Sequence, residues 1–155
     1  MRFITPDLIN LINSTTETTE QIENLWNSRI DELENHYSRI SNKLPESANA
    51  FISSHDLLNC SSFSRSVNLN DEFLFIIGDY ENKEILFLQY EVIGKIEVDT
   101  HVGDGFGSRS NPIWLYDEFH VKKSYFEHHI IFNDGLGYVI PFKSFAFRKS
   151  EWFKD

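Results

Sequence analysis

The sequence predicts an α+β fold, in which N-terminal helices, one of them long and amphipathic, pack on a curled antiparallel β-sheet of five to seven strands. Two periodicities predict it: apolar residues recur every three or four positions up to about residue 44, and alternate with polar residues after residue 55. More than half of the aromatic side chains lie between Trp114 and Phe153, within the predicted strands. Helices followed by strands are typical of an α+β domain.

The length of 155 residues favours a single domain over 1–155, with a helical part at 1–53 and a sheet part at 54–155. A hydrophobic content of 41% and a charged content of 25% are ordinary for a globular protein. No apolar stretch is long enough to span a membrane, and the N-terminus lacks the pattern of a signal peptide. The lone Cys60 cannot form an internal disulfide. We therefore expect a cytoplasmic protein with no membrane segment.

Two helix starts and one long apolar stripe stand out in the helical part. Thr5 and Pro6 predict a short helix that ends near Ser14, and Thr18 with Gln21 forms a capping box before a longer helix. Pro45 ends the long helix and begins a third, short one. The apolar stripe of the long helix consists of Ile22, Leu25, Trp26, Ile30, Leu33, Tyr37, Ile40 and Leu44.

The sheet part divides into strands separated by turn residues. The polar segment 57–67 predicts an edge strand, and strands are expected at 72–77 and 84–98, with a turn at 78–83 between them. A glycine-rich loop is expected at 100–112. Strands at 113–122, 125–133 and 136–142 follow, joined by tight turns at Lys123-Ser124 and Asp134-Gly135, so they must be antiparallel. Phe145, Phe147 and Trp152 predict a last strand or a packed tail.

No residue set has the spacing of a known catalytic or cofactor site. The segment 103–107 is rich in glycine but lacks the flanking strand, helix and Lys-Ser/Thr pair of a phosphate loop. His55-Asp56 lacks the further ligands of a phosphohydrolase metal site, and no Gly-x-Ser-x-Gly elbow occurs. The sequence therefore predicts no enzyme, no cofactor, and no catalytic, cofactor-binding or metal-ligating residues.

The densest polar cluster lies on the two strands around the Lys123-Ser124 turn. Strict alternation puts Trp114, Tyr116, Glu118 and His120 on one face of the first strand, and Leu115, Asp117, Phe119 and Val121 on the other. Depending on the register, Glu118 or His120 neighbours His128 or His129, which point to opposite faces. Cross-strand pairing is the expected role of these side chains. The alternative is a small metal-dependent hydrolase that uses Glu118 with His120, His128 or His129.

The formal net charge of −10 argues against direct nucleic-acid binding and favours a basic partner. Residues 71–99 carry eight acidic side chains against two lysines. This strand region is the predicted partner-binding surface, although it could serve only to keep the protein soluble. The candidate residues are Glu72, Asp79, Glu81, Glu84, Glu91 and Glu97, with Trp114 and Tyr116 as possible aromatic anchors or, alternatively, core residues.

Several short motifs resemble small bacterial α+β proteins of unknown function that are similar to immunity proteins of polymorphic and contact-dependent toxin systems. The motifs are Leu44-Pro45-Glu46-Ser47, Ser54-His55-Asp56, Trp114-Leu115-Tyr116-Asp117-Glu118, Phe126-Glu127-His128, Asn133-Asp134-Gly135 and Ile140-Pro141-Phe142. The resemblance transfers no catalytic residues. It implies a cytosolic α+β protein that binds a cognate toxin and blocks its active site, and the acidic charge of the chain favours a toxin with a basic surface. A self-associating structural protein, paired through the edge strand at 57–67, is a further alternative.

Overall fold

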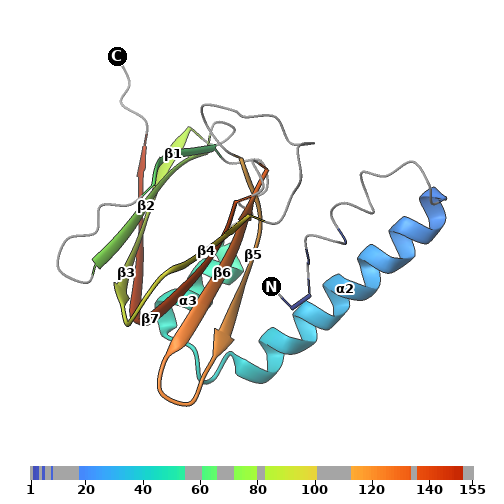
Figure 1. Cartoon of the computed structure of the whole chain (residues 1–155), viewed down its shortest axis with the longest axis horizontal. Helices are drawn as coiled ribbons and strands as arrows, with labels where there is room; N and C mark the ends of the chain where they lie inside the picture. Colours follow the sequence, from blue (N-terminus) through green and yellow to red (C-terminus); the bar gives the residue numbers. More distant parts are fainter. Residues whose placement is uncertain are drawn as a thin grey trace.

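The computed structural model describes residues 2–3, 5, 8, 18–54, 61–65, 72–79, 83–100, 113–133 and 136–151. Within them, two helices and seven antiparallel strands confirm the predicted α+β fold (Figure 1). The helices are α2 (Thr19–Ile40) and α3 (Glu46–Ser54). The strands are β1 (Ser61–Arg65), β2 (Glu72–Asp79), β3 (Glu84–Val92), β4 (Glu97–Thr100), β5 (Trp114–Val121), β6 (Phe126–Phe132) and β7 (Leu136–Glu151).

The sheet has the order β1-β2-β3-β7-β6-β5, and β4 pairs separately with β7. The described strands curl around α3, and the main strand order ends at the edge strands β1 and β5 (Figure 1). α3 contributes Ala48 and Phe51 to the main core, and Phe51 packs edge-on against Phe119 and Phe145. The concave face of the sheet is therefore the core face, and we call the opposite face the outer face.

The long strand β7 organises the sheet. Its first half pairs with β6 and β4, and its second half pairs with β3 from Val92 to Glu84. The predicted strand at 136–142 and the expected last strand or tail thus form one continuous element of 16 residues. The expected strand at 84–98 is wrong in its length, because Gly94 adopts a φ of 79° that turns the chain between β3 and β4.

The capping box at Thr18 and Gln21 is confirmed, and α2 follows it for 22 residues. No residue of α2 is buried, so the helix rests on the sheet along one stripe. Its first half packs Leu25, Trp26 and Ile30 on the outer face around Ile131. Its second half brings Tyr37 and Ile40 to the main core, so α2 crosses the β5 edge and covers it (Figure 1).

Two side chains of α2 form hydrogen bonds with the backbone of edge strand β5, on the edge that does not pair with β6. Tyr37 Oη accepts a hydrogen bond of 3.2 Å from the N–H of Phe119, and His36 Nε2 lies 3.0 Å from the carbonyl oxygen of the same residue. An edge strand with unpaired backbone groups favours association with other chains. At Phe119, side chains of α2 provide hydrogen-bond partners for both the backbone N–H and the backbone C=O.

The predicted faces of β5 are wrong at Trp114. The β5–β6 register shifts between Trp114, opposite Phe132, and Tyr116, opposite Ile131. Leu115 is the extra residue of this bulge, and an extra residue reverses the alternation. Trp114 therefore shares the core face with Asp117 and Phe119, whereas Tyr116, Glu118 and His120 lie on the outer face.

Several predicted features lie outside the described residues: the short helix at 6–14 apart from Leu8, the His55-Asp56 pair, Cys60, the loop at 101–112, the Asp134-Gly135 turn and Trp152. The predicted edge strand at 57–67 is described as β1, and it does lie at an edge of the sheet. Neither described helix is both long and apolar enough to cross a membrane.

Candidate functional site

Two of the predicted acidic residues form a pair on the outer face. Glu72 of β2 lies directly opposite Glu91 of β3, and both side chains are exposed. Glu91 accepts a hydrogen bond of 3.0 Å from Ser144 Oγ. In the part of the chain that the structure describes, neither carboxylate forms an ion pair. Like charges directly opposite in an antiparallel pair destabilise the sheet, so this pair carries a cost.

Apolar side chains continue from this pair along the same face. The outer-face positions next to the acidic pair hold Leu74 opposite Gln89, then Ile76 opposite Phe87. All four of these side chains are partly exposed. Glu72, Glu91, Leu74, Ile76 and Phe87 define what we call the acidic-apolar surface.

The other acidic candidates lie elsewhere or are already paired. Glu84 forms an ion pair of 3.1 Å with Lys149. Glu97 is exposed on β4. β4 pairs with the first half of β7 and β3 pairs with the second half, so Glu97 lies along a different part of β7 from Glu91. Asp79 ends β2, and the structure describes its backbone but not its side chain; Glu81 lies outside the described residues. Strand pairing thus places Glu72 opposite Glu91 and Asp79 opposite Glu84, and of these two pairs the second already has a cation, Lys149, bound to Glu84.

The two aromatic candidates have different environments. Trp114 is fully buried, at 0% exposure, and its Nε1–H donates to Asp117 Oδ1 over 3.2 Å. Of the two roles that the sequence left open for Trp114, core residue or exposed anchor, the structure shows the core role. Tyr116 is partly exposed, packs against Trp26 of α2 at 4.9 Å between ring centroids, and lines a small groove with it. Tyr116 therefore contributes to the contact between α2 and the sheet.

His128 lies on the core face, in a buried polar network. Its ring stacks on Phe119 with centroids 3.8 Å apart, Tyr90 Oη lies 2.7 Å from its Nδ1, and Asp117 Oδ2 lies 2.8 Å from its Nε2. Burial lowers the pKa of His128 and raises that of Tyr90 well above its ordinary value. A neutral His128 that accepts from Tyr90 and donates to Asp117 satisfies both ring nitrogens, which indicates a structural role.

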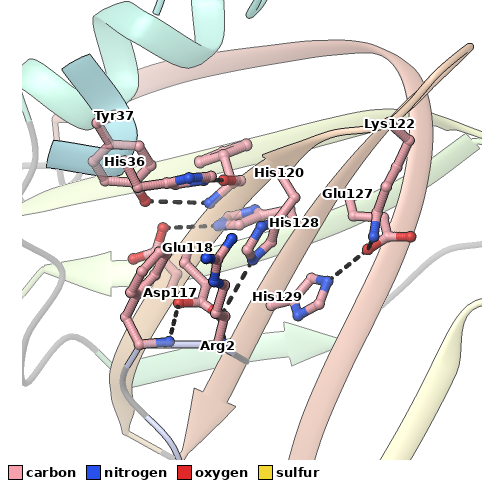
Figure 2. A network of polar contacts seen from close by, with 12 residues as sticks. Arg2, His36, Tyr37, Asp117, Glu118, His120, Lys122, Glu127, His128 and His129 are labelled. Atoms are coloured by element: carbon pink, nitrogen blue, oxygen red, sulfur yellow. Dashed lines mark hydrogen bonds and ion pairs between the residues drawn. The ribbon is translucent and has the colours of Figure 1, made fainter. Parts of the chain in front are cut away.

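The outer face gathers three side chains of metal-binding type from β5 and β6. Glu118 lies directly opposite His129, and His120 is two residues further along β5 (Figure 2). One donor atom from each of Glu118, His120 and His129 lies within 4.8 Å of the other two. Glu118 is fully buried, and the side chains of His120 and His129 are only 12% and 15% exposed. The register, which the sequence left open, decides this grouping and excludes His128.

Glu118 holds the N-terminal segment against the sheet. Its carboxylate accepts the backbone N–H groups of Arg2 and Phe3, the latter over 3.1 Å, and its Oε1 lies 3.2 Å from His120 Nε2. Burial raises the pKa of Glu118, but these donors outweigh that effect and hold the pKa below its ordinary value. Glu118 is therefore an ionised carboxylate beside two imidazoles.

A second carboxylate orients His129. Glu127 Oε2 lies 2.8 Å from His129 Nε2 and 3.0 Å from Lys122 Nζ, and its Oε1 accepts from Tyr125 over 3.2 Å (Figure 2). The Nδ1 of His129 is buried and has no hydrogen-bond partner among the described residues. Burial lowers the pKa of His129 to about 4, despite the contact with Glu127, so the ring is neutral at pH 7.

A groove of about 600 Å3 opens beside this cluster. His129, Glu127 and Tyr125 form one side, and Lys95, Glu97 and the β7 residues Val139 and Pro141 line the remainder. His129 belongs to both the cluster and the groove, so the groove adjoins the cluster at this residue.

His36 of α2 is the neighbour that the sequence did not indicate. Its ring lies 5.1 Å from that of His120 and 5.0 Å from that of Phe3 between centroids. Burial lowers the pKa of His36. No local pattern connects a helix residue to a strand 84 positions later, so only the tertiary structure reveals this contact.

Family models, curated proteins and solved structures were each compared with the chain, and none of them matches it. The residues themselves therefore carry the functional argument.

Proposed function

We propose that the chain is a non-enzymatic binding protein, an immunity protein that binds and neutralises a cognate bacterial toxin in the cytoplasm through its acidic-apolar surface. The observation that supports this proposal most directly is the opposed pair Glu72 and Glu91, which are exposed and form no ion pair within the described residues. A like-charge pair costs stability, and a basic partner would remove that cost on binding.

The neighbouring side chains suit a protein partner. Leu74, Ile76 and Phe87 are partly exposed next to the acidic pair, and protein interfaces combine an apolar centre with a polar, charged rim. The net charge of −10 steers a basic partner toward the chain and raises the association rate. A toxin that cuts nucleic acid would present such a basic surface.

Co-expression tests the proposal. A secreted protein with a toxin-like C-terminal domain, encoded next to this chain, should arrest growth when its C-terminal domain is expressed alone, and this chain should restore growth. The two purified proteins should form a complex whose affinity falls with salt concentration. A chain that neither bound nor neutralised this toxin domain would not be an immunity protein against it, and the proposal would be rejected.

A further inference from the structure

We propose that Glu118, His120 and His129 form a binding site for a divalent transition metal, with zinc as the best-suited ion. This site lies on the outer face of β5 and β6, and it does not depend on the proposed toxin binding. Two imidazoles and one carboxylate are a donor set that zinc accepts.

The first argument is the geometry of the donor atoms. They lie within 4.8 Å of one another, and a tetrahedral zinc with bonds of about 2.1 Å needs a ligand spacing of roughly 3.4 Å. The three side chains therefore have to move closer together when the ion binds. Three protein ligands leave the fourth position for water or for a small molecule in the groove, which His129 also lines.

The second argument is a pair of buried ring nitrogens that lack a well-aligned hydrogen bond. His120 Nε2 and His129 Nδ1 are buried and make no well-aligned hydrogen bond with the described residues, although His120 Nε2 lies 3.2 Å from Glu118 Oε1. Buried polar atoms without a partner are rare because they cost free energy. Both histidines belong to the cluster, and a metal ion bound through these two nitrogens would satisfy both at once.

The third argument is the carboxylate of Glu127, which holds the ring of His129 by a hydrogen bond. Metal-binding histidines usually donate their second ring N–H to a carboxylate, which fixes the tautomer and makes the ligating nitrogen more basic. Glu127 accepts from His129 Nε2 over 2.8 Å, and Lys122 and Tyr125 hold Glu127 in place. This bond leaves His129 Nδ1 as the unprotonated nitrogen, which is buried and available as a ligand.

Titration of the full chain with Zn²⁺, followed by calorimetry, tests the site. One zinc ion should bind per chain. Glu127→Gln should weaken the affinity by about 10- to 100-fold, and His120→Gln or His129→Gln should weaken it further. The matched control is His36→Gln, which removes the neighbouring imidazole that is not a donor and should leave the affinity unchanged.

A spectroscopic measurement on the unmodified chain covers the case in which a variant does not fold. Co²⁺ should give the intense visible absorption bands of a four-coordinate site, and added Zn²⁺ should displace it with the loss of those bands. The proposal is overturned if Co²⁺ gives only the weak spectrum of the hexaaqua ion. It is also overturned if the folded double variant His120→Gln/His129→Gln binds zinc as tightly as the unmodified chain.

Discussion

Tyr90 and His128 form a hydrogen bond of 2.7 Å across the core, although their strands β3 and β6 are not neighbours in the sheet. β7 lies between the two strands, and the curl of the sheet brings the two side chains together. Both residues are fully buried. This bond therefore links the two halves of the curled sheet.

The Tyr90–His128 bond predicts the effect of Tyr90→Phe. This variant leaves His128 Nδ1 buried without a donor, which should lower the free energy of unfolding by about 1–3 kcal/mol. Urea denaturation measures the change. Tyr138→Phe is the matched control, because Tyr138 belongs to the same core and its hydroxyl has no hydrogen-bond partner among the described residues; its effect should be much smaller. Equal effects of the two variants would contradict a special role for the Tyr90 hydroxyl.

Stability should fall as the pH drops from about 7.5 to 5. Burial lowers the pKa of His36, His128 and His129 from an ordinary value of 6.5. Above that value neither the folded nor the unfolded state protonates these rings. Below it the unfolded state binds protons that the folded state excludes, so each such histidine removes up to about 1.4 kcal/mol per pH unit.

Urea denaturation of the metal-free chain at several pH values checks this dependence. His36→Gln removes one of the three groups and should make the dependence shallower. This pH window, from about 7.5 to 5, lies above the range in which Glu118 and Glu127 become protonated in the folded chain, because the pKa of each carboxyl group is held below its ordinary value of 4.5. A free energy of unfolding that stayed constant down to pH 5 would show that these rings are protonated in the fold.

Tyr37→Phe should expose the edge of β5. The variant loses the hydrogen bond to the Phe119 N–H, at a cost of about 0.5–1.5 kcal/mol. Amide hydrogen exchange should show faster exchange at Phe119 than in the unmodified chain. Ser38→Ala changes an exposed hydroxyl on the same helix and should have little effect at Phe119. Unchanged protection at Phe119 in Tyr37→Phe would mean that α2 does not cap the edge.

Glu72→Lys should stabilise the isolated chain. The change converts a like-charge pair with Glu91 into an opposite-charge pair, which is worth about 0.2–1 kcal/mol in a sheet. Thermal denaturation at low salt measures the gain, and high salt should reduce it. The control Glu34→Lys makes the same charge change on the exposed face of α2 and should not give a comparable gain. A destabilised Glu72→Lys would remove the main support for the proposed function.

The double variant Glu72→Lys/Glu91→Lys should bind the toxin domain more weakly, mainly through a slower association, by about 10-fold or more. Asp31→Lys/Glu34→Lys is the matched control, with the same change in net charge on α2. Surface plasmon resonance at several salt concentrations measures the association rate and the dissociation rate separately. Equal losses in both variants would show that the net charge, rather than the acidic-apolar surface, governs binding.

Much of the fold follows from local patterns in the sequence. The stripe of α2, the capping box at Thr18 and the turn at Lys123-Ser124 are short-range features, and the structure confirms all three. The predicted site was less accurate. Charge along the chain indicates six acidic candidates, but strand pairing places only four of them opposite one another, Glu72 with Glu91 and Asp79 with Glu84.

The sequence by itself determined the α+β class, the order of helices and strands, and the presence of carboxylates and imidazoles on β5 and β6. Only the tertiary structure decided which of these carboxylates and imidazoles contact one another. One extra residue at Leu115 moved Trp114 into the core, and the register placed Glu118 opposite His129. The physical reason is that side chains alternate with a period of two, so a shift of one residue exchanges the faces, and such shifts are set by contacts between distant segments.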